Sequence, residues 1–178
     1  MIEILFSIFV VILCVWIIYT VLFLAPWLPT FSRDMKRIVE IANLDEGDVF
    51  CELGSGDGRV SFYVSEKSPQ AKIIGVEISY ILHSIASVKK MFSHAKNITF
   101  KREDIYRTNL SDVDVIYVFA TSRSANRLAR YLQKSVKKGS RIISYNFQLP
   151  FESKVATEKK VKEKKRTWYY MCMIWLDK

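Results

Sequence analysis

Glycines at alternate positions, directly after a short apolar segment, constrain the fold of this chain more than any other feature. Residues 48–60 read D-V-F-C-E-L-G-S-G-D-G-R-V. The apolar part, Val49 to Leu53, suits a buried strand, and a helix is expected to open at Arg59 after the glycines. Glycine permits positive φ and has no Cβ atom, so a polar or anionic ligand can lie against bare backbone near the positive end of that helix. Strand, turn and helix in this order predict a ligand site at the turn.

A second feature supports a nucleoside ligand. The apolar run from Lys72 to Val76 ends in Glu77. Nucleotide-binding α/β folds place a carboxylate for the ribose hydroxyls roughly 20 residues after the glycine turn. The turn is nevertheless G-x-G-x-G rather than the dinucleotide pattern G-x-G-x-x-G, and Glu52 stands two places before the first glycine. These differences favour a nucleoside other than a dinucleotide.

The turn resembles the first motif of the class I S-adenosylmethionine-dependent methyltransferases, commonly E/D-x-G-x-G-x-G at the end of the first strand. The resemblance continues through G-V-E at 75–77 and R-E-D at 102–104, and it covers nearly all of the chain after residue 33. A narrower resemblance is to the small protein lysine methyltransferases of archaea and their membrane-anchored mitochondrial relatives. It rests on L-G-S-G-D-G-R in the turn, the V-F pair at 118–119 and R-I-I-S-Y-N-F at 141–147.

This resemblance implies S-adenosylmethionine as the cofactor. It gives Glu77 the place of the ribose carboxylate and Asp104 that of the acidic residue near the adenine amine. An acidic residue at a strand end is also a common helix or turn cap, so both interpretations of Asp104 stay open. The residues expected to contact the cofactor are Glu52, Gly54, Ser55, Gly56, Gly58, Glu77, Ile78, Asp104, Ile105 and Phe119.

The N-terminal segment is strongly apolar. Ile4 to Ala25 is an almost unbroken run of about 22 residues, enough for about 33 Å of helix, which predicts one transmembrane helix. A cleaved signal peptide is the alternative, but no Lys or Arg precedes the run and no small-residue cleavage pattern follows it. Basic residues just after the run, at 33, 36 and 37, place the C-terminal domain in the cytosol or an equivalent interior compartment. We expect three parts: an anchor (1–28), a linker with an N-terminal helix (29–47) and an S-adenosylmethionine-binding domain (48–178).

Charge limits the partners. The chain has 27 basic and 18 acidic residues and a net charge of +9. Such a surface attracts anionic lipid headgroups and nucleic acid, but no recognised nucleic-acid module occurs, which argues against nucleic acid. The Lys-rich arm at 154–166 fits an exposed edge strand protected by charge, or a contact with lipid or an acidic partner. Three widely spaced cysteines give no disulfide frame and no metal site.

Strands alternate with helices after residue 48, which predicts an α/β fold with a doubly wound, mostly parallel sheet of seven strands. The apolar run 168–176 is expected to complete a C-terminal antiparallel hairpin, and a helix at 33–44 to pack over the cofactor pocket. For the helix at 79–95 the apolar spacing predicts a buried face. Its members are Ile81, Leu82, Ile85, Val88 and Phe92.

The methyl acceptor needs an environment of its own. A neutral nucleophile must come within about 3 Å of the methyl carbon in a dry site. A lysine amine has a reference pKa of about 10.4, which burial among aromatic rings would lower. The expected acceptor wall consists of Phe119, Tyr145, Phe147 and Phe151, although aromatic residues on strands are as often core residues.

Three functions follow from these observations. The first is a membrane-anchored methyltransferase acting on protein lysine ε-amines, whose partner is a protein with an accessible lysine. The second is a methyltransferase for a lipid, quinone or other membrane-borne small molecule. The third is an inactive, membrane-tethered cofactor-binding scaffold, against which the intact glycines and Glu77 argue. The sequence F-A-T-S at 119–122, in place of [D/N/S]-P-P-[Y/F], counts against nucleobase substrates.

Overall fold

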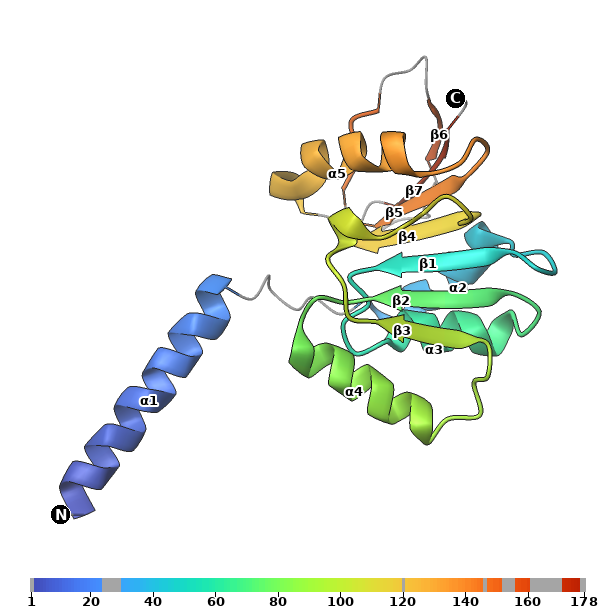
Figure 1. Ribbon diagram of the computed structural model, residues 1–178. Coiled ribbons are helices and arrows are strands. Elements are labelled where there is room, and N and C mark those ends of the chain that lie inside the picture. The colour runs from blue at the N-terminus through green and yellow to red at the C-terminus, as the bar shows by residue number, and fades with distance from the viewer. Residues whose placement is uncertain are drawn as a thin grey trace.

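The computed structural model describes residues 2–23, 30–119, 121–145, 147–151, 156–160 and 171–176. Seven strands form one sheet in the order β3-β2-β1-β4-β5-β7-β6 (Figure 1). The strands are β1 (Val49–Leu53), β2 (Lys72–Val76), β3 (Ile98–Lys101), β4 (Val115–Phe119), β5 (Arg141–Tyr145), β6 (Ala156–Lys160) and β7 (Met171–Leu176). The helices are α1 (Ile2–Phe23), α2 (Ser32–Ala42), α3 (Arg59–Lys67), α4 (Tyr80–Met91) and α5 (Ser122–Ser135), with a 3₁₀ turn η1 (Ile105–Arg107).

The first five strands are parallel, which confirms the predicted α/β fold with a parallel sheet. Strand β1 is the middle one of the five parallel strands. The chain runs from β1 outward to β2 and β3 and then returns to β4 on the other side of β1, so the strand order reverses beside β1. Open sheets of this kind bind ligands beyond the carboxyl ends of the strands at such a switch point. Strand β7 pairs antiparallel with β5, and β6 pairs antiparallel with β7.

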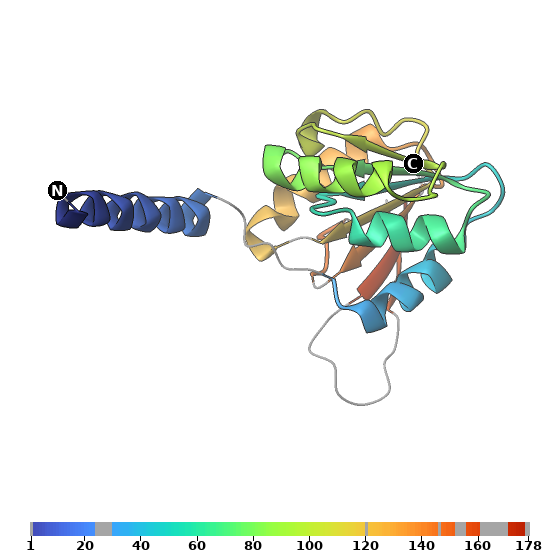
Figure 2. The same ribbon diagram turned by 90° about the horizontal axis from the view of Figure 1, so that it is seen from below.

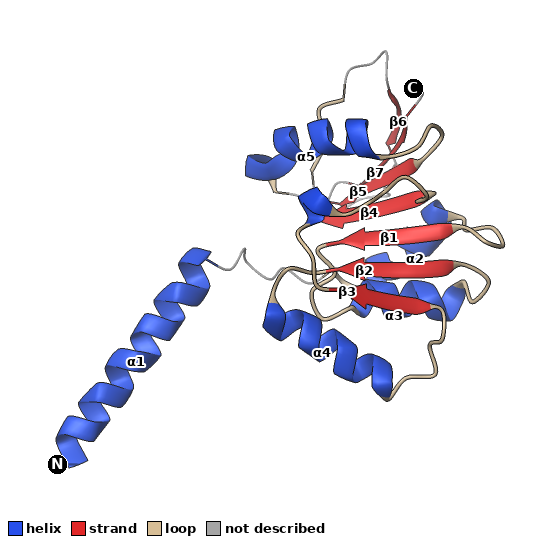
Figure 3. Cartoon of the chain, viewed as in Figure 1, coloured by secondary structure: helices blue, strands red, loops and turns tan. Residues whose placement is uncertain are grey.

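Helices cover both faces of the sheet (Figure 3). On one face α5 buries Leu128 and Leu132 against a core that includes Ile116 and Ile142. On the other face α2 and α3 pack over a second core, which contains Phe50 and Tyr117. Strands buried on both sides read as continuous apolar runs, and β4, with the sequence VIYVF, is an example.

Helix α2 is fastened to β5 at both of its ends. Near its start, the Tyr145 hydroxyl donates a hydrogen bond of 2.7 Å to Oδ2 of Asp34. At its end, the Arg141 guanidinium donates to the carbonyl oxygen of Ala42 at 2.7 Å and to Oδ2 of Asp48 at 2.8 Å. Because Tyr145 ends β5, the first turn of α2 lies at the carboxyl edge of the sheet.

The expectation of a membrane anchor is not met. Helix α1 lies apart from the sheet in Figures 1 and 2, and its side chains over residues 2–15 are exposed. Among the residues that the structure describes, no helix has both the length and the apolar character needed to span a membrane. The predicted single-pass topology, with the C-terminal domain in the cytosol, is therefore wrong.

The expected buried face of α4 is also wrong. Ile81, Ile85, Val88 and Phe92 are exposed, and Leu82 is half-buried. Within α4 the one buried residue is Ala86. Polar contacts hold α4 instead: Nζ of Lys89 lies 2.7 Å from Oδ2 of Asp57, and the Ser79 N–H before the helix donates to Glu77 at 2.8 Å. With α4 held in this way, the side that contains Ala86 faces the sheet.

Candidate active site

The glycine turn lies at the carboxyl end of β1, as expected. Gly54, Gly56 and Gly58 have φ values of 82°, 54° and 80°, a region that favours glycine. The backbone N–H groups of Gly54 and Ser55 both donate to the carbonyl oxygen of Val76, at 2.8 and 2.9 Å. These bonds fold the turn back over the end of β2.

Glu77 joins the two loops at this edge of the sheet. Its Oε2 accepts a hydrogen bond from the Gly56 N–H at 2.9 Å, and its Oε1 accepts one from the Ser79 N–H at 2.8 Å. The residue is 9 % exposed. Hydrogen bonds from backbone N–H groups to a carboxylate are about twice as strong as neutral ones, so Glu77 fixes the glycine turn relative to the start of α4.

Glu52 is buried under the turn. Its Oε2 accepts from both the backbone N–H and the hydroxyl of Ser61, at 2.9 and 2.6 Å. Burial raises the pKa of Glu52 to about 8, although the Ser61 hydrogen bonds work in the opposite direction. Glu52 therefore holds the first turn of α3 beneath the glycines.

Asp57 is the third carboxylate of the turn, and two cations hold it. Nζ of Lys89 on α4 lies 2.7 Å from Oδ2, and Nε of Arg59 lies 3.0 Å from Oδ1. Burial works to raise the pKa of Asp57, but the hydrogen bonds from Arg59 and Lys89 outweigh it and lower the pKa below its ordinary value. No sequence motif indicated Lys89, because its partner lies 32 positions away.

The remaining residues expected at the cofactor lie at the same edge. Oδ1 of Asp104 accepts from the Tyr106 N–H at 2.9 Å, so Asp104 caps η1. Ile105 is half-buried and packs on the core under α5, whereas Ile78 is 65 % exposed. The Glu103 N–H donates to the carbonyl oxygen of Glu77 at 3.3 Å, which brings the two loops that carry these residues together.

The four aromatic residues expected around the acceptor separate into two pairs. Phe119 and Tyr145 end β4 and β5 on the α2 side of the sheet, with ring centroids 5.1 Å apart in an edge-on arrangement. Phe147 and Phe151 are half-buried and pack against the core on the α5 side. Tyr145 is 1 % exposed, so its ring belongs to the core, and its hydroxyl is the group that reaches the edge.

Sequence reasoning missed the polar residues that α2 adds to this edge. Asp34 is 4 % exposed and bonded to Tyr145, and the Thr30 hydroxyl lies 2.8 Å from the Tyr117 hydroxyl. Arg33 and Arg37 lie 3.9 Å from the Asp34 carboxylate oxygens, longer than a hydrogen bond. An aspartate in the first turn of a predicted helix resembles an ordinary helix-stabilising charge, so the sequence offers no signal that it is buried.

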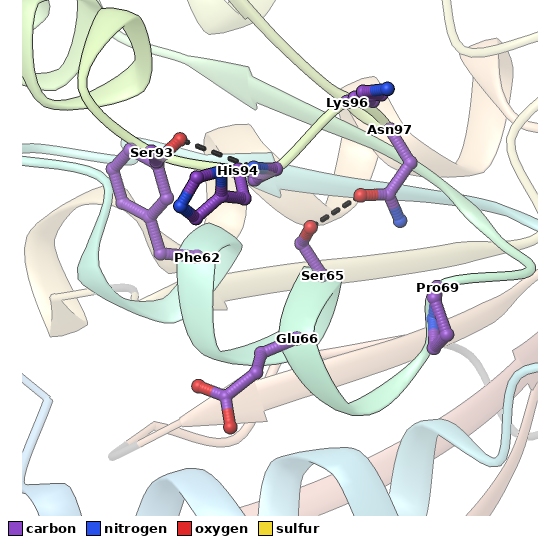
Figure 4. A pocket seen from close by; sticks show the side chains of 9 residues that line it. Phe62, Ser65, Glu66, Pro69, Ser93, His94, Lys96 and Asn97 are labelled. Atoms are coloured by element: carbon purple, nitrogen blue, oxygen red, sulfur yellow. Dashed lines mark hydrogen bonds between the residues drawn. The ribbon is translucent and has the colours of Figure 1, made fainter.

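A separate pocket of about 480 Å³ lies away from this edge, between α3 and the loop before β3 (Figure 4). Phe62, Ser65, His94 and Asn97 are among its lining residues. The Asn97 amide donates to the carbonyl oxygen of Ala71 at 2.8 Å and its oxygen accepts from the Ser65 hydroxyl. Asn97 precedes β3, so this pocket lies near the amino ends of the strands and is not the cofactor site.

Comparison with known proteins identifies the family. The family model described as the ANTKMT methyltransferase domain matches residues 52–156, more than half of the chain. The chain belongs to this family. The matched segment begins at Glu52 and includes the glycine turn, Glu77, Asp104 and the ends of β4 and β5.

Individual relatives of this chain also have methyltransferase names. A protein-lysine N-methyltransferase of Saccharolobus islandicus is 26 % identical over 126 residues, which are 70 % of this chain and 78 % of that protein. The adenine nucleotide translocase lysine N-methyltransferase of Mus musculus is 24 % identical over 132 residues, 74 % of this chain and 57 % of the mouse protein. This chain thus spans little more than half of the mouse relative's length.

A solved structure shows the same fold. An RNA methyltransferase from Salinibacter ruber, in complex with S-adenosyl-L-homocysteine, superimposes with a TM-score of 0.72 at 23 % identity. The match covers 84 % of this chain and 93 % of that one. This chain is therefore an S-adenosylmethionine-dependent methyltransferase, and the predictions of a class I methyltransferase, an enzyme and this cofactor are confirmed.

The residues at the edge of the sheet fit this cofactor. The Ser55 hydroxyl is buried and is the one buried side-chain polar atom, among those the structure describes, with no hydrogen-bond partner. A Cβ atom built at Gly54 would meet nothing within 4 Å, so the backbone at the head of the turn is open to a ligand. A buried polar group without a partner beside open backbone offers a hydrogen bond to a polar ligand at this turn.

Proposed function

We propose that this methyltransferase transfers methyl groups to the ε-amine of lysine in a protein substrate. The observation that carries the proposal is a buried carboxylate on the acceptor side of the crevice, Asp34, hydrogen-bonded to Tyr145 at the end of β5. The names of the archaeal and mouse relatives support it. A lysine arrives as an ammonium ion, and a buried carboxylate beside aromatic rings is suited to receive it.

The chain's own residues divide the work between two sides. On the cofactor side we assign binding to the glycine turn, with Glu52 and Glu77 holding its backbone in place and Ile78, Ile105 and Phe119 at its borders. Asp104 is proposed to face the adenine amine with the carboxylate oxygen that η1 does not use. When bound, S-adenosylmethionine supplies a methyl group made electrophilic by its sulfonium.

On the acceptor side the Tyr145 hydroxyl donates to Oδ2 of Asp34, and the incoming ammonium is proposed to pair with Oδ1, from which Nη1 of Arg37 is 3.9 Å away. Phe119 lies edge-on to Tyr145 and keeps water from the amine. Oδ1 of Asp34 is the group placed to accept the ammonium proton, which leaves a neutral amine as the nucleophile. The bond between the methyl carbon and the sulfonium sulfur of the bound cofactor would break as the new nitrogen-to-carbon bond forms. Phe147 and Phe151 are proposed to line the entrance from the α5 side.

We also propose a division of the chain. Residues 48–178 are assigned to the catalytic domain, with β6 and β7 as a C-terminal hairpin that completes a seven-stranded sheet. Residues 29–47 are assigned to a linker and α2, which adds Asp34 to the site. The family model, which begins at residue 52, supports the start of the catalytic domain.

The test uses the full chain with methyl-labelled S-adenosylmethionine and a cell extract, separated into protein and organic-phase fractions. We expect label in protein that hydrolyses to methyl-lysine. Asp34→Asn and Tyr145→Phe should raise KM for the protein acceptor at least about tenfold, because a charge-assisted hydrogen bond contributes about 1.5–3 kcal/mol. Cofactor affinity measured by calorimetry should not change.

The matched control is Asp112→Asn, which removes an exposed carboxylate just before β4, at the amino end of that strand. It should leave both KM for the acceptor and the cofactor affinity unchanged. Label confined to the organic phase would contradict the protein substrate. An Asp34→Asn variant with normal KM would contradict the role of Asp34 and leave the substrate assignment standing.

A further inference from the structure

The outward face of α4 is apolar along its whole length. Ile81, Ile85 and Val88 are 60 %, 41 % and 51 % exposed, and Phe92, directly after the helix, is 84 % exposed. The intervals between these four residues are four, three and four positions, the spacing of residues that form the contact line of two packed helices. Met91 beside them is 79 % exposed.

The sequence of α4 shows that its apolar residues point away from the sheet. The side toward the sheet has Ala86 buried and Ser79 and His83 half-buried. Monomeric proteins rarely expose apolar side chains in a continuous group, and such a group marks an interaction site. Something is therefore expected to cover this face.

The positions of the four residues make the face complementary to itself. If two copies of α4 run antiparallel about a two-fold axis between residues 86 and 87, Ile81 lies opposite Phe92 of the partner subunit. In the same alignment Ile85 lies opposite Val88 of the partner subunit. We propose that α4 pairs with α4 of a second copy of this chain in this register. A contact about a two-fold axis uses the same surface twice, as the alignment does.

Pairing in this register does not disturb the residues assigned to the cofactor. Ile78, assigned to the cofactor, lies outside the paired stretch, and Lys89 keeps its ion pair with Asp57. The contact extends over about 18 Å of helix at 1.5 Å per residue. A contact of this length falls at the low end of interface sizes, below about 1,200 Å², which predicts a weak dimer in the micromolar range.

The salt dependence of association distinguishes a second copy of α4 from an anionic lipid surface as the partner of this face. Helix α4 contains no Asp or Glu and has Lys89 and Lys90 in its last turn, so two copies of the helix carry the same charge. Added salt screens the repulsion between the two copies and should strengthen a dimer. Binding of a basic surface to anionic lipid weakens with salt instead.

The first experiment tests the register by disulfide cross-linking of full chains in which Cys14 and Cys172 are replaced by Ser. Equal amounts of an Ile85→Cys chain and a Val88→Cys chain are mixed and oxidised, and the linked peptides are identified by mass. We expect the 85-to-88 pair to form at least about tenfold faster than an 85-to-138 pair made with Lys138→Cys, an exposed position outside α4. Equal rates would overturn the proposed register.

The second experiment measures association by sedimentation velocity from about 5 to 200 µM, the range in which a small interface dissociates. Ile85→Glu should raise the dissociation constant of the dimer at least about tenfold. Unchanged cofactor affinity, measured on the same sample, shows that the variant is folded. Ile8→Glu is the matched control, since Ile8 is an exposed apolar residue of α1.

Three outcomes would overturn the proposal: a chain that stays monomeric at all concentrations, a dimer broken by Ile8→Glu and not by Ile85→Glu, or association seen only with vesicles that contain anionic lipid and weakened by salt. Because methyl transfer to protein is assayed separately, failure of the dimer leaves the proposed function untouched.

Discussion

The two sides of the crevice satisfy their polar groups in different ways. On the cofactor side, Glu52, Asp57 and Glu77 bind backbone or side-chain groups that lie 2 to 32 positions away in sequence. On the acceptor side, Asp34 and Tyr145 are 111 positions apart. The proposed cofactor side is built from contacts that span at most 32 positions, whereas the proposed acceptor side forms only after α2 has docked on β5. Substitutions should therefore affect the two sides independently.

The largest effect is expected from Gly58→Ala. Gly58 has a φ of +80°, and a Cβ atom there would lie 2.6 Å from Cζ of Phe100. Strain and overpacking together should lower the free energy of unfolding by about 3 kcal/mol or more and abolish cofactor binding. Urea unfolding and calorimetry measure the two effects.

Gly139→Ala is the matched control, because Gly139 has a φ of +81° and nothing within 4 Å of its Cβ position. Strain alone should cost about 1–2 kcal/mol there and leave cofactor affinity unchanged. If both variants lost equal stability, the contact with Phe100 would not be the reason that position 58 requires glycine.

Glu77→Ala should weaken cofactor binding about 100-fold. The substitution leaves the N–H groups of Gly56 and Ser79 without their acceptor, and each such hydrogen bond to a charged group contributes about 1.5–3 kcal/mol. Isothermal titration calorimetry with S-adenosylmethionine measures the loss, and KM for the acceptor should not change when the cofactor is saturating.

For comparison, Glu66→Ala removes an exposed carboxylate of α3 whose side chain is 68 % exposed. Its cofactor affinity should equal that of the unmodified chain. Normal affinity in Glu77→Ala as well would show that the junction of the two loops is not part of the cofactor site.

Glu52 should make stability depend on pH. Its pKa is about 8 in the folded protein against an ordinary 4.5, so between these values the folded state binds more protons than the unfolded state. The stabilisation is complete below about pH 4.5, decreases as pH rises through about 8, and has a slope of at most about 1.4 kcal/mol per pH unit. Urea unfolding at pH values between 5.5 and 8 measures this slope, and Glu52→Gln should reduce it. An unchanged slope in the variant would mean that Glu52 is ionised in the folded protein.

The smallest effect is expected from Lys89→Met, which should weaken cofactor binding about fivefold. The Lys89 side chain is 46 % exposed, so its pair with Asp57 contributes about 1 kcal/mol or less, and Arg59 continues to hold the carboxylate. Lys90→Met, one position along the same helix, should have no effect on affinity. Equal losses in both variants would point to the general charge of α4 and not to the pair.

The difference between the two sides also explains which site residues could be predicted from the sequence. The glycine turn, Glu52 and Glu77 form a local pattern, and each lies at the carboxyl edge where it was expected. Asp34 and Lys89 were missed because burial and partners distant in sequence give no local signal. The alternation of strands and helices predicted the parallel sheet for the same reason that the turn was visible: both are short-range patterns.

Two predictions failed because apolar spacing identifies a helix face but not what the face contacts. The stripe of α4 has the spacing of a core face, yet its residues are exposed and Ala86 is the buried residue of the helix. The apolar run near the N-terminus met the length rule for a membrane span, whereas no helix among the described residues qualifies as one. In both cases the sequence pattern correctly predicted a helix, but the predicted surroundings of that helix, protein core for α4 and lipid for the N-terminal run, were wrong.

The attachment of α2 to β5 has a consequence for the order in which the protein forms during synthesis. Tyr145 follows Asp34 by 111 positions, and Arg141 follows Ala42 by 99. At about 5–20 residues per second, the ribosome needs roughly 5 to 20 s to add that much chain. Throughout this interval α2 has neither of its two attachments, and the glycine turn, to which we assign the cofactor, is synthesised well before the proposed acceptor side can assemble. A nascent chain stopped before residue 141 should therefore already contain every residue of the glycine turn and its carboxylates, but none of the β5 residues that hold Asp34 in place.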